Sequence, residues 1–203
     1  MKKEKIITLI TAMGLSLAGV ATVAVHPEQT IQATATTQGN KYGLGKCYTL
    51  PQSLRGTWFT QVSNMSPMKI TKHSFSRPGT NGKKLYAVVY VVGKVKGTNK
   101  YPWQMTGKFD KYYEKALRIG KTRKMRGLKW TVIGPVDDHA PKMATAYTMH
   151  EENIDGQTVK VVFEADYTGK VVNQYFTTLE LAQKYSKQKF TDMTYFNLDK
   201  LPQ

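Results

Sequence analysis

One segment limits the fold of this chain more than any other: residues 85–95 read LYAVVYVVGKV. β-Branched and aromatic side chains dominate it, and such side chains fit extended backbone better than helix. The run is too continuous in apolar character to leave one face in water. We therefore predict a strand at the centre of a sheet.

Turn signals divide much of the remaining chain into further short strands. The clearest is Asp155-Gly156, a dipeptide typical of tight primed turns in which both central residues take positive φ. It predicts a hairpin between residues 144–150 and 158–166. The apolar and β-branched patterns predict further strands at residues 54–62, 68–75, 128–133 and 171–176.

Two segments have helical periodicity. Apolar residues recur at steps of three and four from Phe109 to Leu117, and Gly120 stands where such a helix would end. Thr177 and Glu180 have the spacing of a capping box. We predict an α+β fold that is mostly antiparallel β, a sheet or small barrel of about seven strands with two short amphipathic helices.

Residues 1–35 have the layout of a secretory signal peptide. A short basic segment precedes the apolar run at residues 6–25, and Ala33 and Ala35 provide the small side chains of a cleavage site. We expect cleavage after Ala35, with Ala33 as the second choice. A retained anchor is the alternative, since about 20 apolar residues can cross a bilayer.

The rest of the chain is expected to be an extracellular protein with one domain. Residues 36–47 are polar and aperiodic, which predicts a flexible tail, and residues 48–203 are predicted to form a single β-rich domain. Cys47 is the lone cysteine, so no internal disulfide can form and stability must come from a core. We interpret Cys47 as a plain structural or surface thiol.

The charge of the chain is strongly positive. Its formal net charge is +16, and removal of the leader, with three lysines and two glutamates, leaves +15. A field of this sign attracts polyanions. The predicted partners are anionic wall polymers and lipid head groups, with non-specific contact to nucleic acid, and the alternative is that the charge only maintains solubility.

The positive charge is concentrated between residues 108 and 129. Tyr112, Tyr113 and Trp130 are interleaved with these cations, so a polyanion would find ion pairs and aromatic faces together, although the aromatic residues alone favour a core. Only Asp110 and Glu114 oppose them. We predict that polyanions bind to Lys108, Lys111, Lys115, Arg118, Lys121, Arg123, Lys124, Arg126 and Lys129. The leading hypothesis is a secreted, basic, non-enzymatic protein that associates with anionic cell-surface material.

The sequence gives no positive signal for catalysis. His150 and Glu151 begin like a zinc-protease motif, but no second histidine follows at the fourth position. Asp137, Asp138 and His139 lie together in a polar loop, where such residues are ordinary. The nucleophile-elbow, P-loop and dinucleotide fingerprints are absent from the sequence. We predict no metal and no cofactor, and an enzyme of unrecognised type is the third hypothesis.

Residues 54–59, LRGTWF, contain a G-x-W motif that is similar to the signature of lipocalin-like barrels. The resemblance implies that Gly56 and Trp58 close one end of a barrel, with a late basic residue such as Lys170 over the tryptophan. It also implies the second hypothesis for function, a carrier of a small apolar ligand. The alternative is that Trp58 is an ordinary core residue.

A second resemblance covers about a third of the chain in fragments. The leader, residues 50–59, residues 68–73 and residues 190–195 resemble a family of small secreted proteins of lactic acid bacteria. The resemblance implies export and a Gram-positive source. It implies no activity and no site residues.

Overall fold

The structure is a computed structural model that describes residues 41–61, 67–78, 84–105, 107, 110–138 and 143–196. The predicted signal peptide, residues 1–35, lies outside the described residues. Within the described ranges, no helix is long and apolar enough to cross a membrane.

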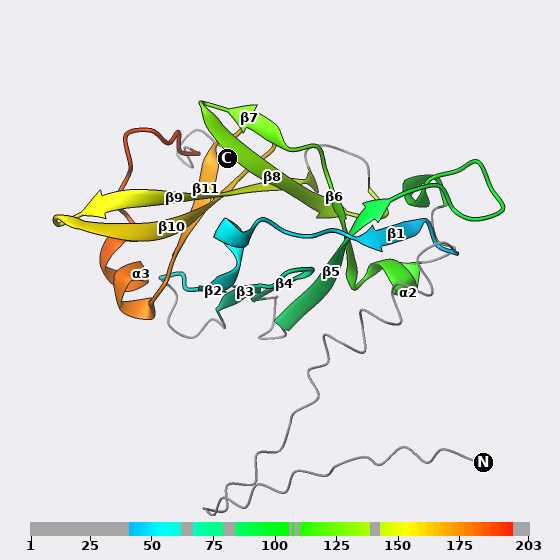
Figure 1. Cartoon of the computed structure of the whole chain (residues 1–203), viewed down its shortest axis with the longest axis horizontal. Helices are drawn as coiled ribbons and strands as arrows, with labels where there is room; N and C mark the ends of the chain where they lie inside the picture. Colours follow the sequence, from blue (N-terminus) through cyan, green and yellow to red (C-terminus); the bar gives the residue numbers. More distant parts are fainter. Residues whose placement is uncertain are drawn as a thin grey trace, which may run out of the picture.

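One curled sheet dominates the described part of the chain (Figure 1). Nine strands follow one another in the order β11-β10-β9-β8-β6-β5-β4-β3-β2, while β1 pairs with β5 and β7 with β8. Every pairing is antiparallel except that of β5 with β6. The strands are β1 (Leu44–Cys47), β2 (Gly56–Trp58), β3 (Met68–Ile70), β4 (Ser74–Pro78), β5 (Lys84–Val92), β6 (Ala116–Ile119), β7 (Arg123–Met125), β8 (Leu128–Pro135), β9 (Thr145–Ile154), β10 (Gln157–Ala165) and β11 (Val171–Phe176).

The two ends of this order meet. Phe59, directly after β2, forms an isolated antiparallel bridge with Phe176 at the end of β11, through backbone hydrogen bonds of 2.8 and 2.9 Å. Because this single bridge is the contact that joins β2 and β11 among the described residues, with no ladder between the two strands, the curled sheet is a half-barrel rather than a fully closed barrel. β5 lies inside the order, as predicted, because β1, β4 and β6 all pair with it.

The predicted class, mostly antiparallel β with few helices, is confirmed. The count of about seven strands is wrong, because the described residues form eleven. One cause is the segment predicted as a single strand at residues 68–75: the Thr71 hydroxyl accepts hydrogen bonds from the backbone N–H groups of His73 and Ser74, which forms a turn between β3 and β4. β8 continues through Gly134 and Pro135, two residues beyond the predicted strand at residues 128–133.

The first predicted helix is mostly wrong. Of the described residues in this segment, only those of α2 (Asp110–Tyr113) are helical, and the chain then enters β6, where Ala116 and Leu117 pair with Val88 and Val89 of β5. The apolar pattern of this segment fits both the helical period of about 3.6 residues and the strand period of two. Pairing with β5 and β8 decides in favour of the strand. Short 3₁₀ turns are formed by η1 (Gln52–Leu54) and η3 (Pro102–Gln104).

The hairpin and the second helix are close to their predictions. Asp155 and Gly156 have φ of 51° and 79° and join β9 to β10, as expected for a primed turn. α3 (Leu179–Tyr185) begins one residue later than predicted, because Thr178 is its N-cap and accepts a hydrogen bond from the Leu181 N–H.

The predicted tail needs a correction. Residues 36–40 lie outside the described residues, but Leu44–Cys47 forms β1 and Tyr42 is buried. Tyr113 on α2 donates a hydrogen bond of 3.0 Å to the Tyr42 carbonyl. The folded region therefore begins before Tyr48, because strand pairing overrides the polar composition of this segment.

The sheet buries apolar residues on both faces, in one cluster on the inner face and two clusters on the outer face. Along β10, Val162 belongs to the inner cluster, while Val161 and Phe163 belong to an outer one, which follows from the alternation of side chains along a strand. Leu50 and Leu54 from the segment before β2 pack in the inner cluster, and this segment runs between β8–β11 and β2–β5 (Figure 1). α3 and the C-terminal segment, residues 187–196, contribute to the outer cluster of β8–β11, and β1 and α2 contribute to that of β5–β6.

Candidate anion-binding groove

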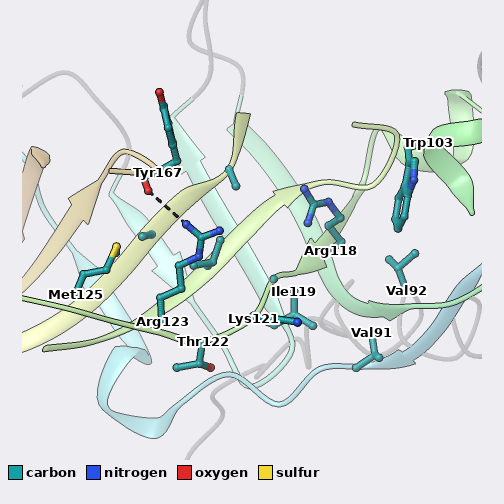
Figure 2. A pocket seen from close by; sticks show the side chains of 14 residues that line it. Val91, Val92, Trp103, Arg118, Ile119, Lys121, Thr122, Arg123, Met125 and Tyr167 are labelled. Atoms are coloured by element: carbon teal, nitrogen blue, oxygen red, sulfur yellow. Dashed lines mark hydrogen bonds between the residues drawn. The ribbon is translucent and has the colours of Figure 1, made fainter. Parts of the chain in front are cut away.

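A groove of about 610 Å³ opens between the two outer clusters. Its apolar floor is formed by Val92 of β5, Val132 of β8 and Ala146 of β9. Figure 2 shows Trp103 at one end and Met125 and Tyr167 at the other, with Arg118 between them. The volume lies within the range of small-molecule sites.

Three cations line this groove: Arg118, Lys121 and Arg123. None of the 14 described residues that line it is acidic. The Arg118 side chain is half-buried, its Nε donates a 3.0 Å hydrogen bond to the Asp138 carbonyl, and burial lowers its pKa. Arg123 Nη1 lies 3.5 Å from the Tyr167 carbonyl. The groove is thus a positively charged concavity with an apolar floor.

The local structure explains why these cations converge. Leu117 and Ile119 pack against the inner cluster, so Arg118 between them must point outward. Gly120 then lets the chain approach β8 closely, because a Cβ at this position would lie 2.9 Å from Val132 Cγ1. Its backbone N–H donates a 2.7 Å hydrogen bond to the Val132 carbonyl.

The remaining predicted cations lie elsewhere. β7 and β8 form a hairpin in which Arg123 is opposite the buried Trp130, whereas Lys124 is opposite the exposed Lys129. Successive strand residues point to opposite faces, so Lys124 and Lys129 lie on the side away from the Arg123–Trp130 pair. Lys111, Lys115 and Arg126 are exposed outside the groove, and Lys108 lies outside the described residues.

The aromatic residues of the predicted site are core residues. Trp130 and Tyr113 are buried, and Tyr112 stacks on Tyr42 with ring centroids 4.1 Å apart. The structure places Trp103 and Tyr167 at the groove instead. Trp103 lies in the 3₁₀ turn η3 and Tyr167 in the turn after β10. An aromatic side chain in a turn was the sequence signal that could have indicated the groove.

Gly56 and Trp58 lie at the end of the strand order. Trp58 is buried in the inner cluster, and its indole N–H donates a 2.8 Å hydrogen bond to the Leu54 carbonyl. Gly56 has φ of 148°, which favours glycine. Lys170 is exposed, and its backbone N–H binds the Asp166 carboxylate. The space beside Trp58 is occupied by Leu50 and Leu54 of its own cluster.

A buried carboxylate lies in the inner region of the half-barrel. Glu164 accepts hydrogen bonds from the hydroxyls of Tyr147, at 3.1 Å, and Tyr175, at 2.6 Å. Arg77 Nη1 lies 3.8 Å from its Oε1. Burial first, and then the charge of Glu164, raises the pKa of both tyrosines, so they remain hydrogen-bond donors to this carboxylate at physiological pH.

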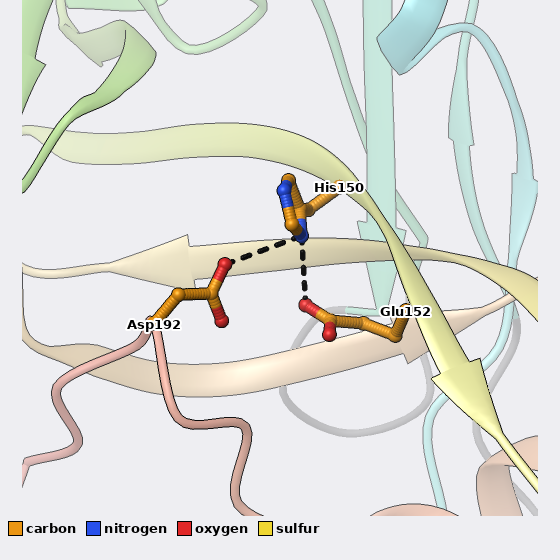
Figure 3. A group of neighbouring side chains, drawn as sticks. All are labelled: His150, Glu152 and Asp192. Carbon is orange, nitrogen blue, oxygen red and sulfur yellow. Dashed lines mark hydrogen bonds and ion pairs between the residues drawn. The ribbon is translucent and has the colours of Figure 1, made fainter.

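Another polar cluster lies where β9 meets the C-terminal segment (Figure 3). His150 Nδ1 is 3.0 Å from Glu152 Oε1 and 3.3 Å from Asp192 Oδ2. In the polar loop that contains Asp137, Asp138 and His139, Asp137 is exposed and His139 lies outside the described residues. The thiol of Cys47 is free and half-buried, and burial raises its pKa.

Comparisons of the chain with protein-family models, with curated proteins and with solved structures find no significant match. The geometry and charge of the groove are therefore the best guide to the function of the protein.

Proposed function

We propose that this is an exported, non-enzymatic protein that binds anionic cell-surface material through the groove. The observation that carries the proposal is the convergence of Arg118, Lys121 and Arg123 on one concavity, with no acidic residue among the described residues that line it. Guanidinium groups suit phosphate and carboxylate, because their N–H donors match two acceptor oxygens. The other exposed cations supply a long-range attractive field.

The rim of the groove favours lipid head groups over wall polymers. Val91 and Tyr167 line the groove and are exposed, and exposed Met143 adjoins Ala144 of its lining. Apolar side chains beside cations match the boundary between phosphate and acyl chain, whereas a soluble polyanion offers nothing for them to contact.

Vesicle sedimentation tests this proposal. The mature protein should pellet with phosphatidylglycerol vesicles, but not with phosphatidylcholine vesicles. Each cation at an anionic surface contributes about 1 kcal/mol, so changing Arg118, Lys121 and Arg123 to Gln should weaken binding roughly 10²-fold. Binding should also fall with salt, because exposed charges are screened.

A matched control variant changes Lys111, Lys124 and Lys129 to Gln, which removes the same charge outside the groove. The loss of vesicle affinity in this control variant should be much smaller than in the groove variant. Equal losses in the two variants would contradict a groove and leave only diffuse attraction. Isolated cell walls and soluble polyphosphate form the other arm of the experiment, and binding confined to them would assign the groove to wall polymers.

The second candidate function is a carrier of a small apolar ligand, which the apolar floor of the groove favours. The floor residues Val92, Val132 and Ala146 would contact such a ligand directly. Saturable one-to-one binding of fatty acids that persists at high salt would support the carrier. Failure of the same panel to bind, with vesicle binding intact, would exclude it.

A further inference from the structure

Three potential metal ligands meet at the contact between β9 and the C-terminal segment. His150 and Glu152 are two residues apart on β9, so the strand places both side chains on one face. Asp192 comes from a distant part of the chain, and burial of its neighbours Phe190 and Met193 in the outer cluster holds it there. The three donor atoms lie within 4.8 Å of one another (Figure 3).

The distances fit a small divalent ion. Ligand bonds of about 2.0–2.1 Å in a tetrahedron place neighbouring donor atoms roughly 3.3 Å apart. His150 Nδ1 lies 3.0 Å from the Glu152 oxygen and 3.3 Å from the Asp192 oxygen. Two edges of such a tetrahedron are therefore close to their required length, with the third edge adjustable by side-chain rotation.

The environment also fits a site with an open coordination position. The Glu152 side chain is 10% exposed, whereas those of His150 and Asp192 are 39% and 38% exposed. His150 Nδ1 is already the polar partner that the buried Glu152 carboxylate needs, and a metal ion between the two groups would replace this contact. The half-exposed ligands leave an entry path and room for water as a fourth ligand.

We propose that His150, Glu152 and Asp192 bind a divalent transition-metal ion, with Zn²⁺ as the best match. One imidazole and two carboxylates suit zinc, whereas Mg²⁺ and Ca²⁺ prefer oxygen ligands throughout. Coordination through Nδ1 leaves the ring proton on Nε2. The ion would join the C-terminal segment to β9, so metal binding would stabilise the docking of residues 187–196.

The second observation is how this segment is held. The Tyr195 hydroxyl accepts a hydrogen bond of 3.1 Å from the Phe190 N–H and lies 3.3 Å from Gln174 Oε1 of β11. Asp192 lies in the loop between Phe190 and Tyr195, and these hydrogen bonds of Tyr195 hold the C-terminal end of that loop. The third ligand is positioned by packing and hydrogen bonds on both sides of it, which is what a preorganised site requires.

Calorimetric titration of the chelator-treated mature protein with Zn²⁺ tests this proposal, with Mg²⁺ as the comparison ion. All variants carry Cys47→Ser, so that the thiol cannot contribute. We expect one ion per chain and a Zn²⁺-dependent rise in Tm, with no response to Mg²⁺. Asp192→Asn, His150→Gln and Glu152→Gln should each weaken Zn²⁺ binding by roughly 100-fold or more, since changes in supporting residues alone already cost 10–100-fold.

Glu151→Gln is the matched control, because Glu151 is exposed and adjacent on β9 but outside the cluster. It should bind Zn²⁺ like the parent protein. Asp192 is exposed, so Asp192→Asn should fold normally even where Glu152→Gln does not, and near-UV circular dichroism checks this. Unchanged Zn²⁺ affinity in a folded Asp192→Asn variant, or no binding by the parent, would overturn the proposal. Vesicle binding by the groove should be the same in all these variants.

Discussion

Changing Leu50 to Ala tests whether the inside of the half-barrel is a packed core or a ligand cavity. Leu50 is 0% exposed and belongs to the inner cluster with Leu54 and Trp58. Its backbone is fixed as well: its N–H donates a 2.8 Å hydrogen bond to the Lys72 carbonyl, and its carbonyl accepts two from Arg55, at 2.7 and 3.1 Å.

These contacts set the expected magnitude. A backbone held at both ends cannot move to fill the space that the lost side chain leaves. Leu50→Ala should therefore lower the free energy of unfolding by roughly 3–5 kcal/mol, the upper part of the range for leucine truncation. For a protein of this size that is a fall in Tm of about 6–20 °C. The new cavity is apolar and should bind a small apolar molecule such as benzene, which would restore part of the stability.

The assay is urea unfolding followed by tryptophan fluorescence, with and without benzene. Gln52→Ala, on the exposed side of the same segment, is the control and should change stability by less than about 0.5 kcal/mol. A loss below about 1 kcal/mol for Leu50→Ala would refute the reasoning. It would mean that the segment before β2 does not fill the half-barrel, and the carrier hypothesis with an internal ligand would gain support.

Two further predictions concern α3. Thr178→Ala removes the hydroxyl that accepts the Leu181 N–H, so it should cost about 1 kcal/mol in urea unfolding, and Thr178→Ser should restore most of this. The pKa of Asp155 lies below its ordinary value of 3.8, because Tyr185 and then Lys184 donate hydrogen bonds to its carboxylate. The stability from this lowered pKa is present above the ordinary value and is lost as the pH falls through the folded-state value. Asparagine also tolerates positive φ, so Asp155→Asn should keep the turn. This variant should lose less stability than the parent protein as the pH falls below the ordinary pKa of aspartate. An unchanged pH profile of unfolding would contradict the assignment of this loss to Asp155.

Features that depend on a few neighbouring residues could be predicted from the sequence. The turn at Asp155 and Gly156 needs only two residues that tolerate positive φ, and the strands beside it need only a local pattern. The strand β5 (Lys84–Val92) could be recognised from the continuous apolar run at residues 85–95, although the strand ends three residues before the run does. The mostly antiparallel β class follows from the density of such signals.

The metal-ligand cluster could be half predicted. His150 and Glu152 share a face because residues two apart on a strand do so, a spacing that a search for helical zinc motifs does not detect. Asp192, however, is 40 residues further along the chain than Glu152, and only packing of Phe190 and Met193 brings it there.

The groove was decided by the tertiary structure alone. The sequence determined that the chain is strongly basic and that residues 108–129 carry much of this charge. It could not separate Arg123, which lines the groove, from Lys124, which points to the other face, because that depends on residues 123–125 forming β7 and pairing with β8. Strand pairing joins residues that are far apart in sequence, so its energy is not contained in any local pattern. The face on which Arg118 lies is set when β6 pairs with β5 and β8, and the faces of Arg123 and Lys124 are set when β7 pairs with β8.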